Sequence, residues 1–237
     1  MLNRKIALLA SAISLIALGS AAHAMPVTVI TGITSGSGFQ TLPTVTPFIG
    51  TVASATFDYM GSINFSNTAA QNSGVSGDLN STFFGAHATG ISNYSGGGTV
   101  MLGASTVANF STLSTFLGSS GSAASYQYAS LYSFDLGTLT AGTVLTITHD
   151  DGASVFQGGT RVGSTVSGPT TVTTDVVTIT TTADTVLWYS RQNGTPSILQ
   201  VSMVAPMSAK VPEPISVGLL GVALAGLGVV RSRRKRA

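Results

Sequence analysis

Polar and apolar residues alternate along much of the chain, in short runs that are separated by glycine, serine and asparagine. In residues 143–149, for example, Leu145, Ile147 and His149 fall on one face of an extended segment and smaller residues fall on the other. A period of two is typical of a strand that buries one face. The predicted strands are residues 27–33, 51–59, 126–136, 143–149, 170–182, 185–190 and 198–204. Their composition and the turn residues between them predict an antiparallel β-sandwich or barrel.

One segment departs from this alternation. Residues 106–117 carry apolar side chains at helical spacing, and Gly118 follows as a helix end. We therefore predict a single amphipathic helix there, and flexible loops around the glycine-rich stretches 35–38 and 96–98. No repeat or linker divides residues 25–210, and the strands before Gly98 have too little apolar length to close a core alone. We predict one extracellular domain.

The N-terminus has the three parts of a secretory signal peptide. Arg4 and Lys5 are basic, residues 6–17 are almost entirely apolar, and Ala22 and Ala24 form a small-residue cleavage site. The pattern predicts a signal peptide over residues 1–24, Sec-dependent export, and a mature chain that begins at Met25. The alternative is an N-terminal membrane helix, against which the apolar run is short.

The C-terminus contains a second apolar segment next to basic residues. Residues 215–230 are apolar, and the residues after them are mostly arginine. The segment predicts a short transmembrane helix in the inner membrane, and the basic end predicts that residues 25–210 lie on the outer side. Immediately before the helix stand Val211, Pro212, Glu213 and Pro214, whose prolines keep this peptide extended.

These three parts together resemble a PEP-CTERM sorting signal. The resemblance covers residues 211–237 and implies processing by an exosortase at the inner membrane of a Gram-negative bacterium that makes exopolysaccharide. It implies delivery to the cell surface or extracellular matrix and a role with exopolysaccharide or biofilm. An ordinary tail anchor is the alternative. The signal identifies a route of export rather than the task of the exported domain.

The charge distribution narrows the function further. Only 8% of the 237 residues are charged, against roughly 25% in ordinary soluble domains. Most of the basic residues lie at the two ends, so residues 25–210 contain Arg161, Arg191 and Lys210 against seven aspartates, a net charge of −4. Such a body is poorly suited to nucleic acid. Both arginines are expected to be solvated surface charges. The chain has no cysteine, which excludes disulfides and thiolate metal sites.

Signatures of catalysis are missing from the sequence. There is no nucleophile elbow and no phosphate-binding loop, and the mature body contains only His87 and His149 as histidines. It has no glutamate before Glu213, so acid–base chemistry would depend on scattered aspartates. We do not expect an enzyme, and a secreted hydrolase is the less favoured alternative.

Asp150 and Asp151 are the main candidates for a site. They follow an alternating strand and precede Gly152, so their carboxylates can direct oxygen ligands at one Ca²⁺. The simpler interpretation is that Asp-Asp-Gly forms a hairpin turn and has no further role.

Residues 126–203 resemble the second half of PA14-like β-sandwich domains, through the Asp150-Asp151-Gly152 and Leu187-Trp188-Tyr189 motifs. The resemblance implies a mainly β, jelly-roll fold and a calcium site in which Asp150 and Asp151 are assisted by Asn193. This chain departs from the family at residues 155–159, which lack the usual acidic residue, and residues 25–125 show no matching motif.

Two functions therefore stay open for the exported body. It binds polysaccharide, through calcium at Asp150 and Asp151, or it is a structural scaffold without a discrete ligand site. Aromatic residues are expected mainly in the core, with sugar platforms as the alternative. The aromatic candidates are Tyr126, Tyr128, Tyr132, Trp188 and Tyr189.

Overall fold

The computed structural model describes residues 24–34, 48–67, 76–78, 81–122, 127–163, 171–191 and 197–206. Within these residues the chain is mainly β and its strand pairings are antiparallel, which confirms the predicted fold class. The strands are β1 (Met25–Thr34), β2 (Phe48–Tyr59), β3 (Asn64–Asn67), β4 (Ser76–Asp78), β5 (Ile91–Gly97), β6 (Thr99–Leu102), β7 (Ser105–Asn109), β8 (Ser120–Ser122), β9 (Gln127–Leu139), β10 (Val144–His149), β11 (Ala153–Gln157), β12 (Thr160–Val162), β13 (Thr173–Thr178), β14 (Ala183–Arg191) and β15 (Ser197–Val204). The short helices are α1 (Ser81–Phe84), the 3-10 helix η1 (Gly85–Gly90) and α2 (Leu113–Leu117).

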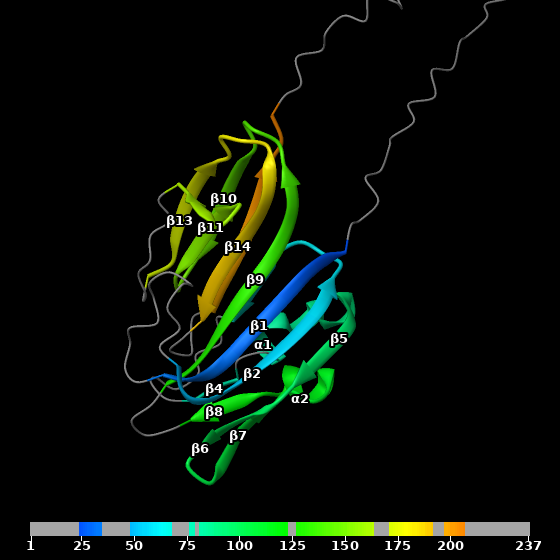
Figure 1. Cartoon of the computed structure of the whole chain (residues 1–237), viewed down its shortest axis with the longest axis vertical. Helices are drawn as coiled ribbons and strands as arrows, with labels where there is room; N and C mark the ends of the chain where they lie inside the picture. The colour runs from blue at the N-terminus through cyan, green and yellow to red at the C-terminus, as the bar shows by residue number, and fades with distance from the viewer. Residues whose placement is uncertain are drawn as a thin grey trace, which may run out of the picture. The chain divides into compact units, whose positions relative to one another are not determined.

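The larger sheet has seven strands in the order β12-β11-β14-β9-β1-β2-β5 (Figure 1). Strand β1 lies between β9 and β2, with Val27 paired to both Phe134 and Phe57. Strands from the first and second halves of the chain therefore form one continuous sheet. The apolar positions of β1 and β2 recur at every second residue, which places them on one buried face.

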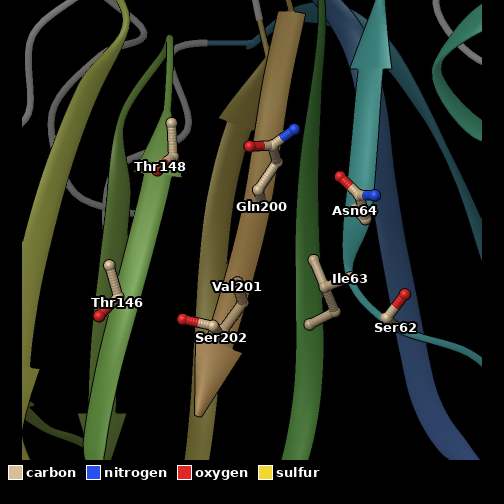
Figure 2. A pocket seen from close by; sticks show the side chains of 8 residues that line it. All are labelled: Ser62, Ile63, Asn64, Thr146, Thr148, Gln200, Val201 and Ser202. Carbon is tan, nitrogen blue, oxygen red and sulfur yellow. The ribbon is translucent and has the colours of Figure 1, made fainter.

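The smaller sheet has four strands in the order β13-β10-β15-β3. One row crosses all four strands, because Thr148 pairs with both Thr174 and Gln200, and Gln200 pairs with Asn64. Figure 2 shows Thr148, Gln200 and Asn64 side by side on the outer face of this sheet. The alternate residues of β10, including His149, are buried on the inner face. Two further pairs, β4-β8 and β6-β7, complete the described strands.

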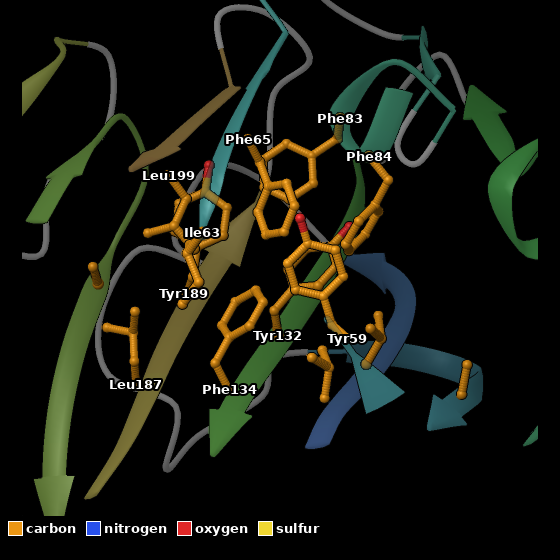
Figure 3. Close-up of a cluster of buried hydrophobic side chains, with 14 of the residues drawn as sticks. Tyr59, Ile63, Phe65, Phe83, Phe84, Tyr132, Phe134, Leu187, Tyr189 and Leu199 are labelled. Carbon is orange, nitrogen blue, oxygen red and sulfur yellow. The ribbon is translucent and has the colours of Figure 1, made fainter. Parts of the chain in front are cut away.

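An aromatic cluster fills the space at the inner faces (Figure 3). Phe83 and Phe84 of α1 are fully buried. The ring of Phe83 lies 5.2 Å from Phe65 of the four-stranded sheet and 5.7 Å from Tyr189 of the seven-stranded sheet, measured between centroids. Phe84 contacts Phe57 of β2 in an edge-to-face arrangement at 5.6 Å. Thus α1, which periodicity did not reveal, joins the two sheets through its two phenylalanines.

The helix predicted over residues 106–117 is correct only in its second half. Residues 105–109 form β7, which pairs with β6, and the helix α2 spans only Leu113–Leu117. It begins after Thr112, whose hydroxyl accepts a hydrogen bond from the Thr115 backbone N–H at 3.1 Å. The reciprocal bond from the Thr112 N–H to the Thr115 hydroxyl completes a capping box. This cap fixes the start of the helix at Leu113, seven residues later than the apolar spacing suggested.

Two other expectations concern loops and membrane segments. Gly96 and Gly97 belong to β5 rather than to a flexible loop, and the chain turns at Gly98, where φ is +91°. No helix in the described residues is long and apolar enough to cross a membrane. Several predicted segments lie outside the described residues. They are the stretch 35–38, the signal peptide over residues 1–24 apart from Ala24, and the sorting tail 211–237 with its apolar segment 215–230.

Candidate functional site

The segment from Asp150 to Gly152 connects the two large sheets. It follows β10, which pairs with β13 and β15, and precedes β11, which pairs with β12 and β14. The Asp-Asp-Gly sequence therefore does not close a hairpin between neighbouring strands. We call this segment, residues 150–152, the crossover.

Both carboxylates of the crossover are buried. Asp150 is 4% exposed and Asp151 is 2% exposed. The backbone N–H of Asp150 donates to the carbonyl of Ile198 on β15 at 3.2 Å, and the Gly152 carbonyl accepts from the Ser190 N–H on β14 at 2.8 Å. The crossover is thus bonded at both ends to strands that flank residues 192–196. Buried carboxylates need hydrogen bonds, a counter-charge or a metal to offset their lost hydration.

His149, immediately before the crossover, orients it. The Nδ1–H of His149 donates to the Asp151 carbonyl oxygen at 2.5 Å, and Nε2 lies 3.0 Å from a carboxylate oxygen of Asp175 on β13. A carbonyl oxygen can only accept, so Nδ1 carries a proton, and a second proton is shared between Nε2 and Asp175. The His149–Asp175 pair is therefore neutral as a whole. Asp150 and Asp151 are the two further carboxylates at this point, and both are buried.

Arg191 does not lie on the surface, contrary to the prediction. It is 0% exposed, at the end of β14, and its Nε donates to the hydroxyl of Ser197 at 2.7 Å. Its Cζ lies 5.3 Å from the centroid of the Phe83 ring, a cation–π contact. The reason is strand alternation: Arg191 shares its face with the core residues Leu187 and Tyr189. Arg161, the other body arginine within the described residues, is half-buried on β12.

Asp150 has the property that best fits a cation ligand. Its Oδ1 is buried and makes no hydrogen bond. Burial raises the pKa of the Asp150 carboxyl, and the positive charges of His149 and Arg191 offset part of this rise. A carboxylate oxygen without a hydrogen-bond partner, beside a second carboxyl group, is suited to a hard cation such as Ca²⁺. The crossover thus offers a calcium ion at least one suitable ligand atom, Oδ1 of Asp150.

The remaining ligands would have to come from elsewhere. No group of three His, Asp or Glu side chains that could hold a metal is present among the described residues. Asn193 belongs to residues 192–196, which lie outside the described residues. The two residues that flank this stretch, Arg191 and Ser197, are hydrogen-bonded to each other, and both adjoin residues that bind the crossover.

Three of the aromatic candidates belong to the core. Tyr128, Tyr132 and Tyr189 are at most 5% exposed, so their rings are not sugar platforms at the surface. Trp188 is half-buried and packs against the small buried cluster of Ala129 and Leu131. Tyr126 lies outside the described residues.

Sequence reasoning missed Asp175 and Arg191 at this site. A signal for both was present, because each lies two residues from a core residue in an alternating strand. Asp175 shares the inner face of β13 with Val177, as Arg191 shares the inner face of β14 with Tyr189. A charged residue on the apolar face of a strand is expected to have a buried partner.

A shallow polar groove lies on the outer face of the four-stranded sheet (Figure 2). Its volume is about 330 Å³, and most of its lining side chains are uncharged hydroxyls and amides. The lining residues are Ser62, Ile63, Asn64, Thr146, Thr148, Gln200, Val201 and Ser202. Thr148 lies on β10, two residues before Asp150 of the crossover, so the groove approaches the end of β10 from which the crossover begins.

The C-terminal sequence matches a known protein family model. Residues 210–235 match the model of the PEP-CTERM protein-sorting motif. The chain carries a PEP-CTERM motif. This confirms the resemblance that rested on Val211, Pro212, Glu213, Pro214 and the basic tail. The motif marks an exported protein of Gram-negative bacteria and a substrate of an exosortase, with a C-terminal intermediate held at the membrane.

Comparison of the whole PEP-CTERM chain with known proteins and solved structures finds only weaker similarity. A comparison with curated proteins finds no match. Among solved structures, the crystal structure of the PA14 domain of the MpAFP antifreeze protein is 18% identical, with 81% of this chain and 88% of that chain covered and a TM-score of 0.42. The PA14 sugar-binding domain from an RTX adhesin is 13% identical, with 75% and 89% covered and a TM-score of 0.39. At these TM-scores the likeness supports no inference about a ligand.

Proposed function

We propose that this chain is an exported protein of the cell surface or extracellular matrix whose β-sandwich binds exopolysaccharide through a calcium ion at the crossover. Asp150 and Asp151 would hold the ion, with Asn193 as a further ligand, and hydroxyl groups of a sugar would complete its shell. The supporting observation is the buried Asp150 Oδ1, which has no hydrogen-bond partner. The protein acts here as a binding protein rather than as an enzyme.

The polar groove offers a second surface for the same polysaccharide. Its hydroxyl and amide side chains can exchange hydrogen bonds with sugar hydroxyls, and its lining contains no charged residue. Residues 25–210 carry a net negative charge, which repels an acidic polysaccharide. The groove has no positive charge to offset this repulsion, so it favours a neutral polysaccharide. We assign the groove a supporting role, since a single shallow polar surface gives weak binding.

Membrane attachment completes the proposal. Residues 215–230 would anchor the chain in the inner membrane until an exosortase acts at the PEP-CTERM motif, after which the body reaches the surface or the matrix, including biofilm. The alternative is a scaffold without a discrete ligand. It is favoured by the nearly complete burial of Asp150 and Asp151, which leaves little of either side chain open to solvent.

Calcium titration of the full chain in detergent micelles tests the proposal. We expect saturable heat with a dissociation constant of about 0.1–1 mM, the range of extracellular calcium modules. Asp150→Asn/Asp151→Asn should abolish it. Retention on immobilised exopolysaccharide should then require calcium, and Asn64→Ala/Gln200→Ala should weaken it without changing the calcium titration. If the wild-type chain gives neither calcium heat nor retention, the scaffold function is correct.

A further inference from the structure

The two large sheets end in four edge strands. Among the described strands, these edges are β5 and β12 of the seven-stranded sheet and β3 and β13 of the four-stranded sheet. An edge strand can pair with another chain, and natural proteins prevent this with charges, prolines, irregular register or short length. Strand β12 has three residues, one of which is Arg161, and β3 has four. The pairing of β5 with β2 shifts register near Asp58, and Asn93 of β5 has a φ of +51°.

Strand β13, at the outer edge of its sheet in Figure 1, has none of these protections on its exposed side. Its six residues, Thr173–Thr178, pair with β10 without a shift in register. The strand contains no proline, and its outward-facing side chains are threonine and valine. Its one charged residue, Asp175, faces inward and is hydrogen-bonded to His149 at 3.0 Å, so its burial is already compensated. The exposed side of this edge therefore carries no charge that would repel a second strand.

The backbone of β13 shows which groups face the free edge. The Ile179 N–H donates to the carbonyl of Thr143, which immediately precedes β10, at 2.8 Å. Ile179 therefore directs its backbone groups toward the β10 side. Because this direction alternates along an antiparallel strand, Thr174, Val176 and Thr178 direct their N–H and C=O groups away from β10. These are the groups to which a further strand would bond.

The side chains of β13 favour a second copy of the same strand as the partner. Val176, in the middle of the edge, is 65% exposed. When two copies of β13 lie antiparallel with Val176 opposite Val176, Thr174 of each copy lies opposite Thr178 of the other, and the exposed valines cover each other. A shift of one residue would turn each strand to the wrong face. A shift of two would place Asp175 opposite Asp175, and like charges directly opposite are destabilising.

We propose that β13 is a self-association edge, at which two copies of this chain pair through Val176 around a two-fold axis and join their four-stranded sheets into one. The contact is isologous, because the same strand serves on both sides. A single pair of strands buries less surface than a stable dimer needs, so the pairing is weak. It therefore forms where many copies are concentrated on one surface.

The pairing has a consequence for the polar groove on the outer face of the same sheet. The two-fold axis between antiparallel strands is perpendicular to the sheet, so the grooves of both copies open on the same side. Two grooves would then hold one polysaccharide at two points, which strengthens binding without a new contact. This consequence rests on the proposed function, whereas the pairing of the strands does not.

Cross-linking of the full chain in detergent micelles tests the contact. Because the chain has no cysteine, a single introduced cysteine reports on one position. Val176→Cys should give a covalent dimer with a short bifunctional thiol reagent. Val204→Cys is the matched control, because Val204 is also 65% exposed and belongs to β15 of the same sheet. In the paired sheets the two Val204 positions are five strand spacings, about 24 Å, apart, so this variant should give only background.

A mixture of two variants tests the register. Thr174→Cys mixed with Thr178→Cys should cross-link, whereas each variant alone should not, because identical positions other than Val176 lie apart along the strands. Cross-linking of Thr174→Cys with Val176→Cys instead would contradict the proposed register.

A charge at the centre of the edge should prevent the pairing. Val176→Lys places two like charges opposite each other and should raise the dissociation constant of the dimer about tenfold, measured by sedimentation over a concentration series. Val204→Lys should leave the dissociation constant unchanged. Both positions are exposed, so neither variant should change Tm.

Three results would overturn the inference. They are equal cross-linking of Val176→Cys and Val204→Cys, no covalent dimer of Val176→Cys, or a dimer that Val176→Lys does not weaken. Val176→Cys dimers in a chain that binds neither calcium nor polysaccharide would support the strand pairing and overturn the proposed function.

Discussion

At the scale of single residues, Tyr94 links β5 to the segment before α2. Its hydroxyl donates to the Phe110 carbonyl at 2.5 Å, and its ring lies 5.7 Å from Phe116. Burial raises the pKa of Tyr94 to about 12. In the unfolded chain, a tyrosine ionises near pH 10. The folded state therefore retains this proton over a range of pH in which the unfolded state has lost it.

The expected result is a loss of stability as pH rises from about 10 to about 12. Burial also raises the pKa of Tyr59, Tyr128 and Tyr189, so the loss is collective. Tyr94→Phe should cost about 1 kcal/mol at pH 7, since the Phe110 carbonyl loses its donor. Between pH 8 and pH 11, the free energy of unfolding measured in urea should fall less for this variant than for the wild type. Equal losses would contradict the assignment.

The residues of the candidate site differ in how far the sequence could predict them. Asp150 and Asp151 were visible as an acidic pair after a strand, but their burial follows from a crossover between sheets, which depends on strand pairings far apart in the chain. The burial of Arg191 could have been predicted from its alternation with Leu187 and Tyr189. The connection of its neighbours to the crossover could not, because the bonds of Ser190 and Ile198 to that segment are tertiary.

At the scale of elements, the start of α2 depends on Thr112. Thr112→Ala should cost about 1 kcal/mol in the free energy of unfolding, because it removes the cap of the Thr115 N–H. Ser114→Ala, an exposed position inside the same helix, is the matched control and should have little effect or a slightly stabilising one. Urea unfolding of both variants measures the difference. The cap is unimportant if the two variants have the same stability.

The sequence predicted most of the long strands, because their alternation survives in the buried faces of β1, β2, β10 and β14. The prediction failed where the local pattern of apolar residues fits both the period of a helix and that of a strand. Val107 and Phe110 suit a helix by spacing, yet residues 105–109 pair with β6. It also missed α1, whose four residues are too short for a helical period to be recognised. The pairing order of the sheets required contacts that the sequence alone does not supply.

At the scale of the whole molecule, the PEP-CTERM motif makes the export route testable. Replacement of Pro212, Glu213 and Pro214 by alanine should block exosortase processing, because these three residues lie in the matched sorting motif. In a Gram-negative host with an exosortase, the chain should then accumulate unprocessed in the membrane fraction, as measured by immunoblotting. Ser216→Ala is the control just beyond the motif and should be processed normally. Normal release of the triple-alanine variant would contradict a role for the motif in processing.

Strand β15 is the last described strand before the sorting motif, and its position has a mechanical consequence. Any pull transmitted along the chain from the C-terminal side enters the folded body at Val204, which pairs with Val144 at the start of β10. Six residue pairs join β10 to β15, from Val144 with Val204 to His149 with Leu199. Ile198, whose carbonyl binds the Asp150 N–H, lies just beyond the last of these pairs. Tension on a tethered molecule must separate these pairs before it reaches Asp150. In the proposed membrane-attached form, these pairs would therefore shield the candidate site from drag or shear.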